Sequence, residues 1–86
     1  MPPIKKQEIQ LTIHIGKRIR LARALQGNTQ ENIGKAMGLS AERVHEYEQG
    51  FYELDVECLQ RFAKALDVPV DYFFVGVDAS MADTVH

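Results

Sequence analysis

The sequence predicts an all-α domain built from five helices. Apolar residues recur at spacings of three and four along most of the chain, which is the period of an amphipathic helix. Capping residues and glycines divide these segments into lengths that suit short helices. After Ile15, no run of alternating β-branched residues is long enough to build a sheet, and 86 residues leave room for one domain.

The two ends of the chain lack a helical pattern. Residues 1–11 contain two early prolines and are expected to form a flexible arm, although alternating apolar residues between positions 9 and 15 leave a short strand as the alternative. Residues 76–86 are small or polar with isolated apolar positions, and a flexible tail is expected there. The helical domain is therefore predicted to span residues 12–75.

The first two predicted helices have recognisable ends. Helix one is expected from about Ile13 to Gln26, with Thr12 as its cap and Gly27 as its C-terminal stop. Helix two is only about two turns long, capped by Thr29 and ended by Gly38. The apolar stripes of the two helices comprise Ile15, Ile19 and Ala22, and then Ile33, Ala36 and Met37.

The remaining helices follow the same logic. Ser40 caps the third helix and Gly50 ends it, while Asp55 caps a fourth helix that must end before Pro69. A short fifth helix is expected over about Val70–Val75. The inward residues of the third and fourth helices are expected to be Val44, Tyr47 and Phe51, and then Val56, Leu59, Phe62, Ala63 and Leu66. The opposite face of the third helix is polar and comprises Glu42, His45, Glu46 and Gln49.

Charge is distributed unevenly along the chain. The net charge is −2, but residues 1–40 carry +5 and residues 41–86 carry −7. This asymmetry indicates either two solvated faces of opposite sign or one half that faces phosphate groups.

Several classes of function find no support in the sequence. The longest apolar runs have four or five residues and no secretory signal is evident, so we expect a cytoplasmic protein without a membrane partner. The single Cys58 lacks a positioned base, and His14 and His45 lie in different predicted helices, so neither a catalytic site nor a metal site is expected. No enzyme activity and no cofactor are predicted.

The aromatic residues are interpreted as packing residues and not as platforms for stacked bases. This interpretation covers Tyr47, Phe51, Tyr52 and Phe62. The segment Tyr72–Phe74 is expected to close the base of the domain, and an exposed part of it would be a candidate dimer contact.

The most informative segment is Gln30 to Gln49, in which two short helices meet across a tight turn. Such a pair needs a small residue where the backbones approach, a glycine in the turn and apolar residues that hold the second helix down. These needs are met by Gly34, Gly38, Val44 and Tyr47.

This segment and its flanks resemble the lambda-repressor-like, Cro/Xre-type family of helix-turn-helix transcriptional regulators. The resemblance spans Ile13 to Phe74 and includes IGKRIRLAR, the Thr29–Gln30 pair, the MGLS turn, the YEQG exit and the closing LQRFAKALDVPVDYFF. It implies a sequence-specific DNA-binding regulator, with helices two and three as the helix-turn-helix and the third helix in the major groove. It also implies a homodimer on a palindromic operator in double-stranded DNA.

The resemblance carries over to individual positions. Gln30 falls where the family clamps a phosphate or a base edge, and Thr29 precedes it at the start of the same helix. Arg43 falls at a backbone-contacting flank, and Lys17 and Lys35 are candidate phosphate contacts. The groove-facing positions are Ser40, Ala41, Glu42, His45 and Glu46. Lys5 and Lys6 would lie along a groove if the arm is ordered.

The chain departs from the family where its third helix is acidic. Glu42 and Glu46 place carboxylates toward a polyanion, and Ala41 offers no hydrogen bond. The glutamates either read cytosine amino groups and reject other sites, or this face no longer binds DNA. The alternative function is a protein-binding module, such as an antiactivator or antitoxin-like partner, that uses the acidic helix with Glu48. Beyond Gly50, the segment FYELD also lacks the basic residues that the family often sets against the backbone.

Overall fold

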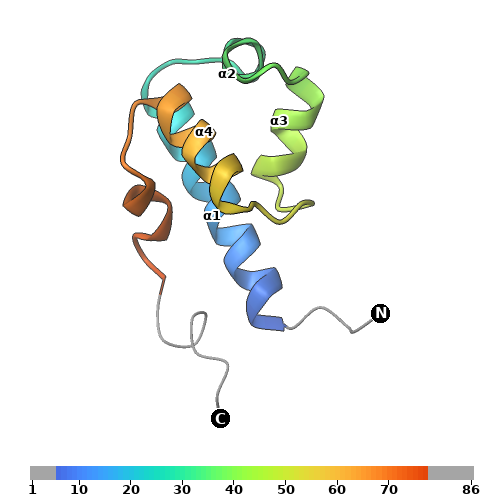
Figure 1. Ribbon diagram of the computed structural model, residues 1–86, viewed down its shortest axis with the longest axis vertical. Helices are drawn as coiled ribbons and strands as arrows, with labels where there is room; N and C mark the ends of the chain where they lie inside the picture. The colour runs from blue at the N-terminus through green and yellow to red at the C-terminus, as the bar shows by residue number, and fades with distance from the viewer. Residues whose placement is uncertain (1–5, 78–86) are drawn as a thin grey trace.

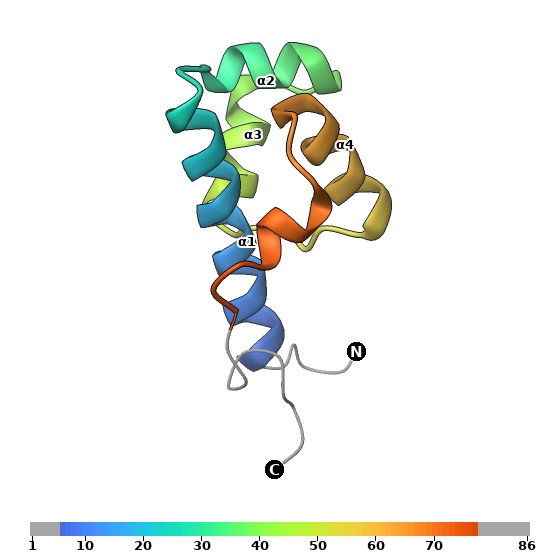
Figure 2. The ribbon, with the colours of Figure 1, turned by 90° about the vertical axis from the view of Figure 1, so that its left-hand side faces the viewer.

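The computed structural model describes residues 6–77, and the regular secondary structure of this part of the chain is all helical. Its elements are α1 (Lys6–Leu25), α2 (Gln30–Met37), α3 (Ala41–Glu48), α4 (Val56–Leu66) and the 3-10 helix η1 (Val70–Phe74). Helix α1 runs along the long axis of the molecule, with α4 beside it, α2 across one end and α3 descending from that end towards the middle of α1 (Figure 1). Turned by 90°, the same arrangement shows η1 against α1 (Figure 2). The predicted all-α class is confirmed.

The N-terminal ends of α2, α3 and α4 are set by the capping residues that the sequence indicated. Thr29 Oγ1 accepts a hydrogen bond of 3.0 Å from the backbone of Asn32, and Ser40 Oγ accepts one of 3.0 Å from the backbone of Arg43. Asp55 caps α4 in the same way, through a bond of 2.8 Å to the third residue beyond it. Each cap satisfies an N–H group that has no partner within its own helix. The predicted starts of α2, α3 and α4 are therefore confirmed.

The core lies between α1 and α4 and is closed by the other three elements. Its largest fully buried side chains are Phe62, Phe73, Ile19, Leu66 and Val44. The remaining buried apolar residues are Ile15, Ala22, Ile33, Met37, Leu59 and Ala63. Since every element contributes at least one side chain to this cluster, the orientation of α3 depends on the packing of the whole domain.

The predicted start of the first helix was wrong. Helix α1 begins at Lys6, so Thr12 lies inside the helix and residues 6–11, which were expected in the arm, are helical. Leu11 packs against the core one turn before Ile15, which follows the helical period, whereas the alternation that suggested a strand finds no partner strand in residues 6–77. The expected placement of Lys5 lies outside the described residues, as does most of the predicted tail.

The fifth predicted helix is a 3-10 helix that side chains of α1 hold in place. His14 Nε2 donates a hydrogen bond of 2.7 Å to the carbonyl oxygen of Val75. Arg18 Nε donates one of 3.0 Å to the carbonyl of Tyr72 and its guanidinium carbon lies 4.0 Å from the centre of that ring. Phe73 is fully buried and closes the base of the domain as expected.

Candidate nucleic-acid interface

The turn between α2 and α3 depends on two glycines. A Cβ atom on Gly34 would lie 2.5 Å from the carbonyl oxygen of Leu39, so any side chain there would collide with the turn. The backbone N–H of Leu39 donates a 2.8 Å hydrogen bond to the carbonyl of Gly34. Gly38 has a φ of 72°, a left-handed conformation that glycine adopts without steric cost. The roles predicted for both glycines are confirmed.

Helix α3 is held on its inner face by α1 and α4. Val44 is fully buried, and the ring of Tyr47 packs edge-on against Phe62 with centroids 5.3 Å apart. A Cβ atom on Gly16 of α1 would lie 2.6 Å from the carbonyl oxygen of Glu48, so the two helix backbones are almost in contact. The outward side chains of Glu42 and His45 remain exposed. The inner face of α3 is thus fixed by packing, and its outer face is open to solvent.

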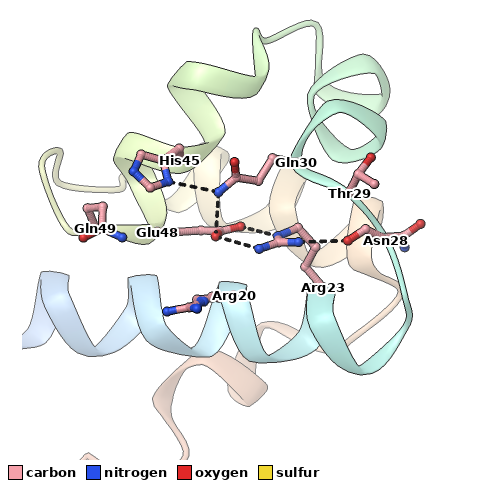
Figure 3. Close-up of a pocket in the computed structure, with 8 residues that line it drawn as sticks. All are labelled: Arg20, Arg23, Asn28, Thr29, Gln30, His45, Glu48 and Gln49. Atoms are coloured by element: carbon pink, nitrogen blue, oxygen red, sulfur yellow. Dashed lines mark hydrogen bonds and ion pairs between the residues drawn. The ribbon is translucent and has the colours of Figure 1, made fainter.

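A buried ion pair joins α1 to the end of α3. Arg23 Nε lies 2.6 Å from Glu48 Oε2, and a second nitrogen of the same guanidinium lies 3.1 Å from Glu48 Oε1. The third donates a 2.9 Å hydrogen bond to the carbonyl of Asn28 (Figure 3). Only 1% of the Glu48 side chain is exposed, so the expectation that Glu48 contributes to an acidic surface was wrong.

The same ion pair orients Gln30 at the start of α2. Gln30 Nε2 donates to Glu48 Oε1 over 3.1 Å and lies 3.1 Å from His45 Nδ1, which accepts because the amide nitrogen is only a donor. Figure 3 shows these three side chains converging between α2 and α3. Two predicted site residues, Gln30 and His45, are therefore brought together, and Glu48, which was not predicted to take part in the DNA-binding site, fixes their geometry.

A cleft of about 410 Å³ opens beside this cluster, between α1 and the helix-turn-helix. Thr29 and Gln30 line it at the N-terminus of α2, where backbone N–H groups favour an anion. Arg20 lines it from α1 and is exposed (Figure 3). Sequence reasoning missed Arg20, although its position one turn before Arg23 was a usable signal. The cleft combines a cation with a helix N-terminus.

The predicted basic residues outside this cleft are more scattered. Lys17 is exposed on α1, and Lys35 lies 3.4 Å from Glu31 on the open surface of α2. Arg43 Nε lies 3.5 Å from Glu46 Oε1. Neither lysine lines the cleft beside Gln30, so the structure does not bring them together with the other predicted site residues.

The groove-facing residues predicted on α3 share one side of the helix, with Ser40 at its N-cap and exposed. Ala41, Glu42, His45 and Glu46 line a shallow hollow on that side. The Glu46 carboxylate accepts a hydrogen bond of 3.3 Å from the Tyr52 hydroxyl, in addition to its ion pair with Arg43. Of the two carboxylates on the groove-facing side of α3, Glu42 and Glu46, the second is thus partly neutralised by contacts within the domain.

Cys58 and Tyr47 lie close to each other and do not line the cleft beside Gln30. Burial raises the pKa of the Cys58 thiol and of the Tyr47 hydroxyl beside it, so both groups stay protonated near neutral pH. Within residues 6–77, no group of three histidine, cysteine, aspartate or glutamate side chains is arranged to hold a metal ion. The same residues include no helix with the length and apolar character needed to cross a bilayer.

Comparison with known proteins places the chain in a family. A family model described as helix-turn-helix matches residues 19–73, and the chain belongs to that family. An uncharacterized HTH-type transcriptional regulator of Sinorhizobium medicae is 37% identical over 70 residues, which cover 81% of this chain and 50% of the relative. An uncharacterized transcriptional regulator in the ATPase CF(0) region of Rhodospirillum rubrum is 38% identical over 76% of this chain and 60% of the relative. The chain thus spans about half the length of the first of these relatives.

Two solved structures show how closely the fold is shared. The restriction-modification controller protein C.AhdI from Aeromonas hydrophila has a TM-score of 0.69 and 28% identity, covering 76% of this chain and 97% of that one. The P22 c2 repressor, solved in complex with a synthetic operator, has a TM-score of 0.64 and 32% identity, covering 72% of this chain and 94% of that one. The lambda-repressor-like fold implied by the sequence is therefore confirmed.

Proposed function

We propose that this chain is a sequence-specific DNA-binding transcriptional regulator whose helix α3 enters the major groove. The proposal rests on how α3 is packed. The inner face of α3 is fixed against α1 and α4, and its outer polar face is free to contact base edges. The P22 c2 repressor, which shares the fold, was solved with an operator, and this supports the same use of the fold here.

The cleft between α1 and α2 is the proposed phosphate site. The N-terminus of α2, with Thr29 and Gln30, offers backbone N–H groups to a phosphate, and Arg20 supplies a positive charge from the opposite wall. Arg43, Lys17 and Lys35 are proposed as outer backbone contacts. Such contacts set the register of the protein on the duplex without reading its sequence.

Base recognition is proposed for the open side of α3, through Ser40, Ala41, Glu42, His45 and Glu46. Glu42 is exposed, and a carboxylate there accepts a hydrogen bond from a cytosine amino group. The Nδ1 atom of His45 accepts a hydrogen bond from Gln30, and this bond does not use the Nε2 atom of the same ring. The site therefore favours base edges that present donors to the glutamate.

The proposal includes the oligomeric state of the protein and its location in the cell. A homodimer on a palindromic site would double the contact surface of a small domain, and Phe74, 38% exposed on η1, is a candidate for the dimer contact. Such a regulator would act on chromosomal or phage DNA, so we propose that it is located in the cytoplasm. We propose no catalytic step and no cofactor.

The test is selection of bound duplexes from a random library at low salt, followed by gel-shift titrations of the enriched sequence. Arg20→Ala and Gln30→Ala are each expected to weaken binding about tenfold, and Arg20→Ala should also reduce the dependence of affinity on salt by about one released counterion. Lys64→Ala, an exposed position on α4, is the matched control and should bind within about twofold of wild type. Failure to enrich any duplex would contradict the proposal.

The protein-binding alternative is less well supported than it was by sequence alone. It depends on an acidic third helix, but Glu48 is buried against Arg23 and Glu46 is paired with Arg43. Only Glu42 remains as an exposed carboxylate of α3 without an ion pair among the described residues. Recovery of one stoichiometric protein partner, with no duplex enriched, would favour this alternative.

A further inference from the structure

Phe51 lies at the surface, just after the end of α3. It was expected to point into the core, but 67% of its surface is exposed and that expectation was wrong. Its backbone N–H donates a 3.0 Å hydrogen bond to the carbonyl of Glu46, which fixes it beside the last turn of α3. Gly50 before it has a φ of 80° and packs against Ile13, so the chain turns outward immediately after the helix. The ring is held at the surface by its backbone.

The neighbouring aromatic residue behaves differently. The ring of Tyr52 lies 5.4 Å from that of Tyr47, stacks under the guanidinium of Arg43 at 4.9 Å and donates through its hydroxyl to Glu46. These contacts account for the presence of Tyr52. Among residues 6–77, no aromatic pair and no cation–π contact involves Phe51.

Phe51 lines a hollow of about 350 Å³ on the open side of α3. The hollow is also lined by Gln30, Ala41, Glu42, His45 and Glu46. The Gln30 amide nitrogen is engaged by Glu48 and His45, and the Glu46 carboxylate is engaged by Arg43 and Tyr52. The apolar groups that the hollow offers to a ligand are the Phe51 ring and the Ala41 methyl group, and the Glu42 carboxylate and the His45 ring line it beside them. It is therefore suited to a small apolar group that lies next to a hydrogen-bond donor.

We propose that Phe51, together with Ala41, is a specificity-determining residue that reads the C5-methyl group of thymine in the major groove. This inference rests on the proposed function, because it assigns a base contact to the same interface. In unmodified DNA, the thymine methyl is the apolar group that base pairs present in the major groove, and phenylalanine and alanine are suitable partners for it. The neighbouring Glu42 would then accept from an amino group on an adjacent base pair.

The experiment uses the duplex that the full 86-residue chain selects from the random library. Each thymidine is replaced singly by deoxyuridine, which removes the C5-methyl group and leaves every hydrogen-bonding group unchanged. Wild type is expected to lose about fourfold in affinity at one or two thymines in each half-site, the effect of uncovering one methyl-sized apolar group. Phe51→Ala should bind more weakly and should no longer distinguish thymine from uracil at those positions.

Phe74→Ala is the matched control, because it removes a ring of the same size, 38% exposed, from η1, which lies on α1 and α4. Its overall affinity is free to change if η1 contributes to dimerisation, but its preference for thymine over uracil should match that of wild type. The ratio of the two affinities thus separates base reading from assembly.

The outcomes are distinguishable. If a duplex is selected but wild type is indifferent to uracil, or Phe51→Ala keeps the wild-type preference, the inference is overturned and the proposed function stands. In a parallel arm, cytosines are replaced by 5-methylcytosine; a gain in affinity there with an unresponsive uracil series would assign the hollow to methylated cytosine and overturn the thymine assignment. If no duplex is selected at all, the proposed function fails and the inference fails with it.

Discussion

Replacement of Arg23 by alanine is expected to lower the free energy of unfolding by about 3–5 kcal/mol, the loss typical of a buried ion pair that is deprived of one partner. Only 16% of the Arg23 side chain and 1% of the Glu48 side chain are exposed. Without the guanidinium, the Glu48 carboxylate would remain buried with Gln30 as its remaining hydrogen-bond donor among the described residues. Urea unfolding followed by circular dichroism measures the loss directly.

Two further variants show whether the loss comes from the unpaired charge. Arg20→Ala removes an exposed arginine from the same helix and should change stability by no more than about 0.5 kcal/mol. The double variant Arg23→Met with Glu48→Met removes both charges and should recover most of the stability, since two apolar side chains then replace the pair. An Arg23→Ala protein as stable as Arg20→Ala would show that the ion pair contributes little.

Gly16→Val is expected to destabilise the domain by about 3 kcal/mol, at the upper end of the usual cost of overpacking. A Cβ atom at this position would lie 2.6 Å from the carbonyl oxygen of Glu48 and 2.7 Å from that of Tyr47. Both obstacles are backbone atoms of α3, so relief requires the two helices to move apart. Any fraction that still folds should therefore bind DNA more weakly, because α3 is displaced from its position.

The matched control for Gly16→Val is Ala24→Val, an exposed position on the same helix that loses a few tenths of a kcal/mol through helix propensity alone. Thermal unfolding of the two variants under the same conditions gives the comparison. Equal transition temperatures would mean that α1 and α3 are not in the close contact described above.

The parts of the fold that depend on local chemistry could be predicted from the sequence. Thr29, Ser40 and Asp55 each bond to a backbone N–H three residues later, and Gly34 and Gly38 act within one turn. Interactions of this kind depend on residues a few positions apart, so the residue type and the spacing determine them.

The parts that depend on partners far along the chain could not be predicted in the same way. Glu48 lies four residues after Val44 and Arg23 four after Ile19, so both charges occupy inward stripes, but their pairing spans 25 residues. The start of α1 was misjudged because the apolar pattern before Ile15 fits both a strand and a helix. Phe51 was assigned to the core because it continues the helical spacing of Val44 and Tyr47, but the left-handed Gly50 before it ends that period and turns the chain outward.

The open side of α3 and the N-terminus of α2 together form the proposed DNA-binding surface. Titration of the isotope-labelled chain with its selected duplex, followed residue by residue through backbone amide signals in NMR spectra, tests this claim directly. The largest changes are expected in residues 29–31 and 40–46, with smaller changes near Arg20 and Phe51. Changes confined to α4 and η1, with those residues unaffected, would contradict it.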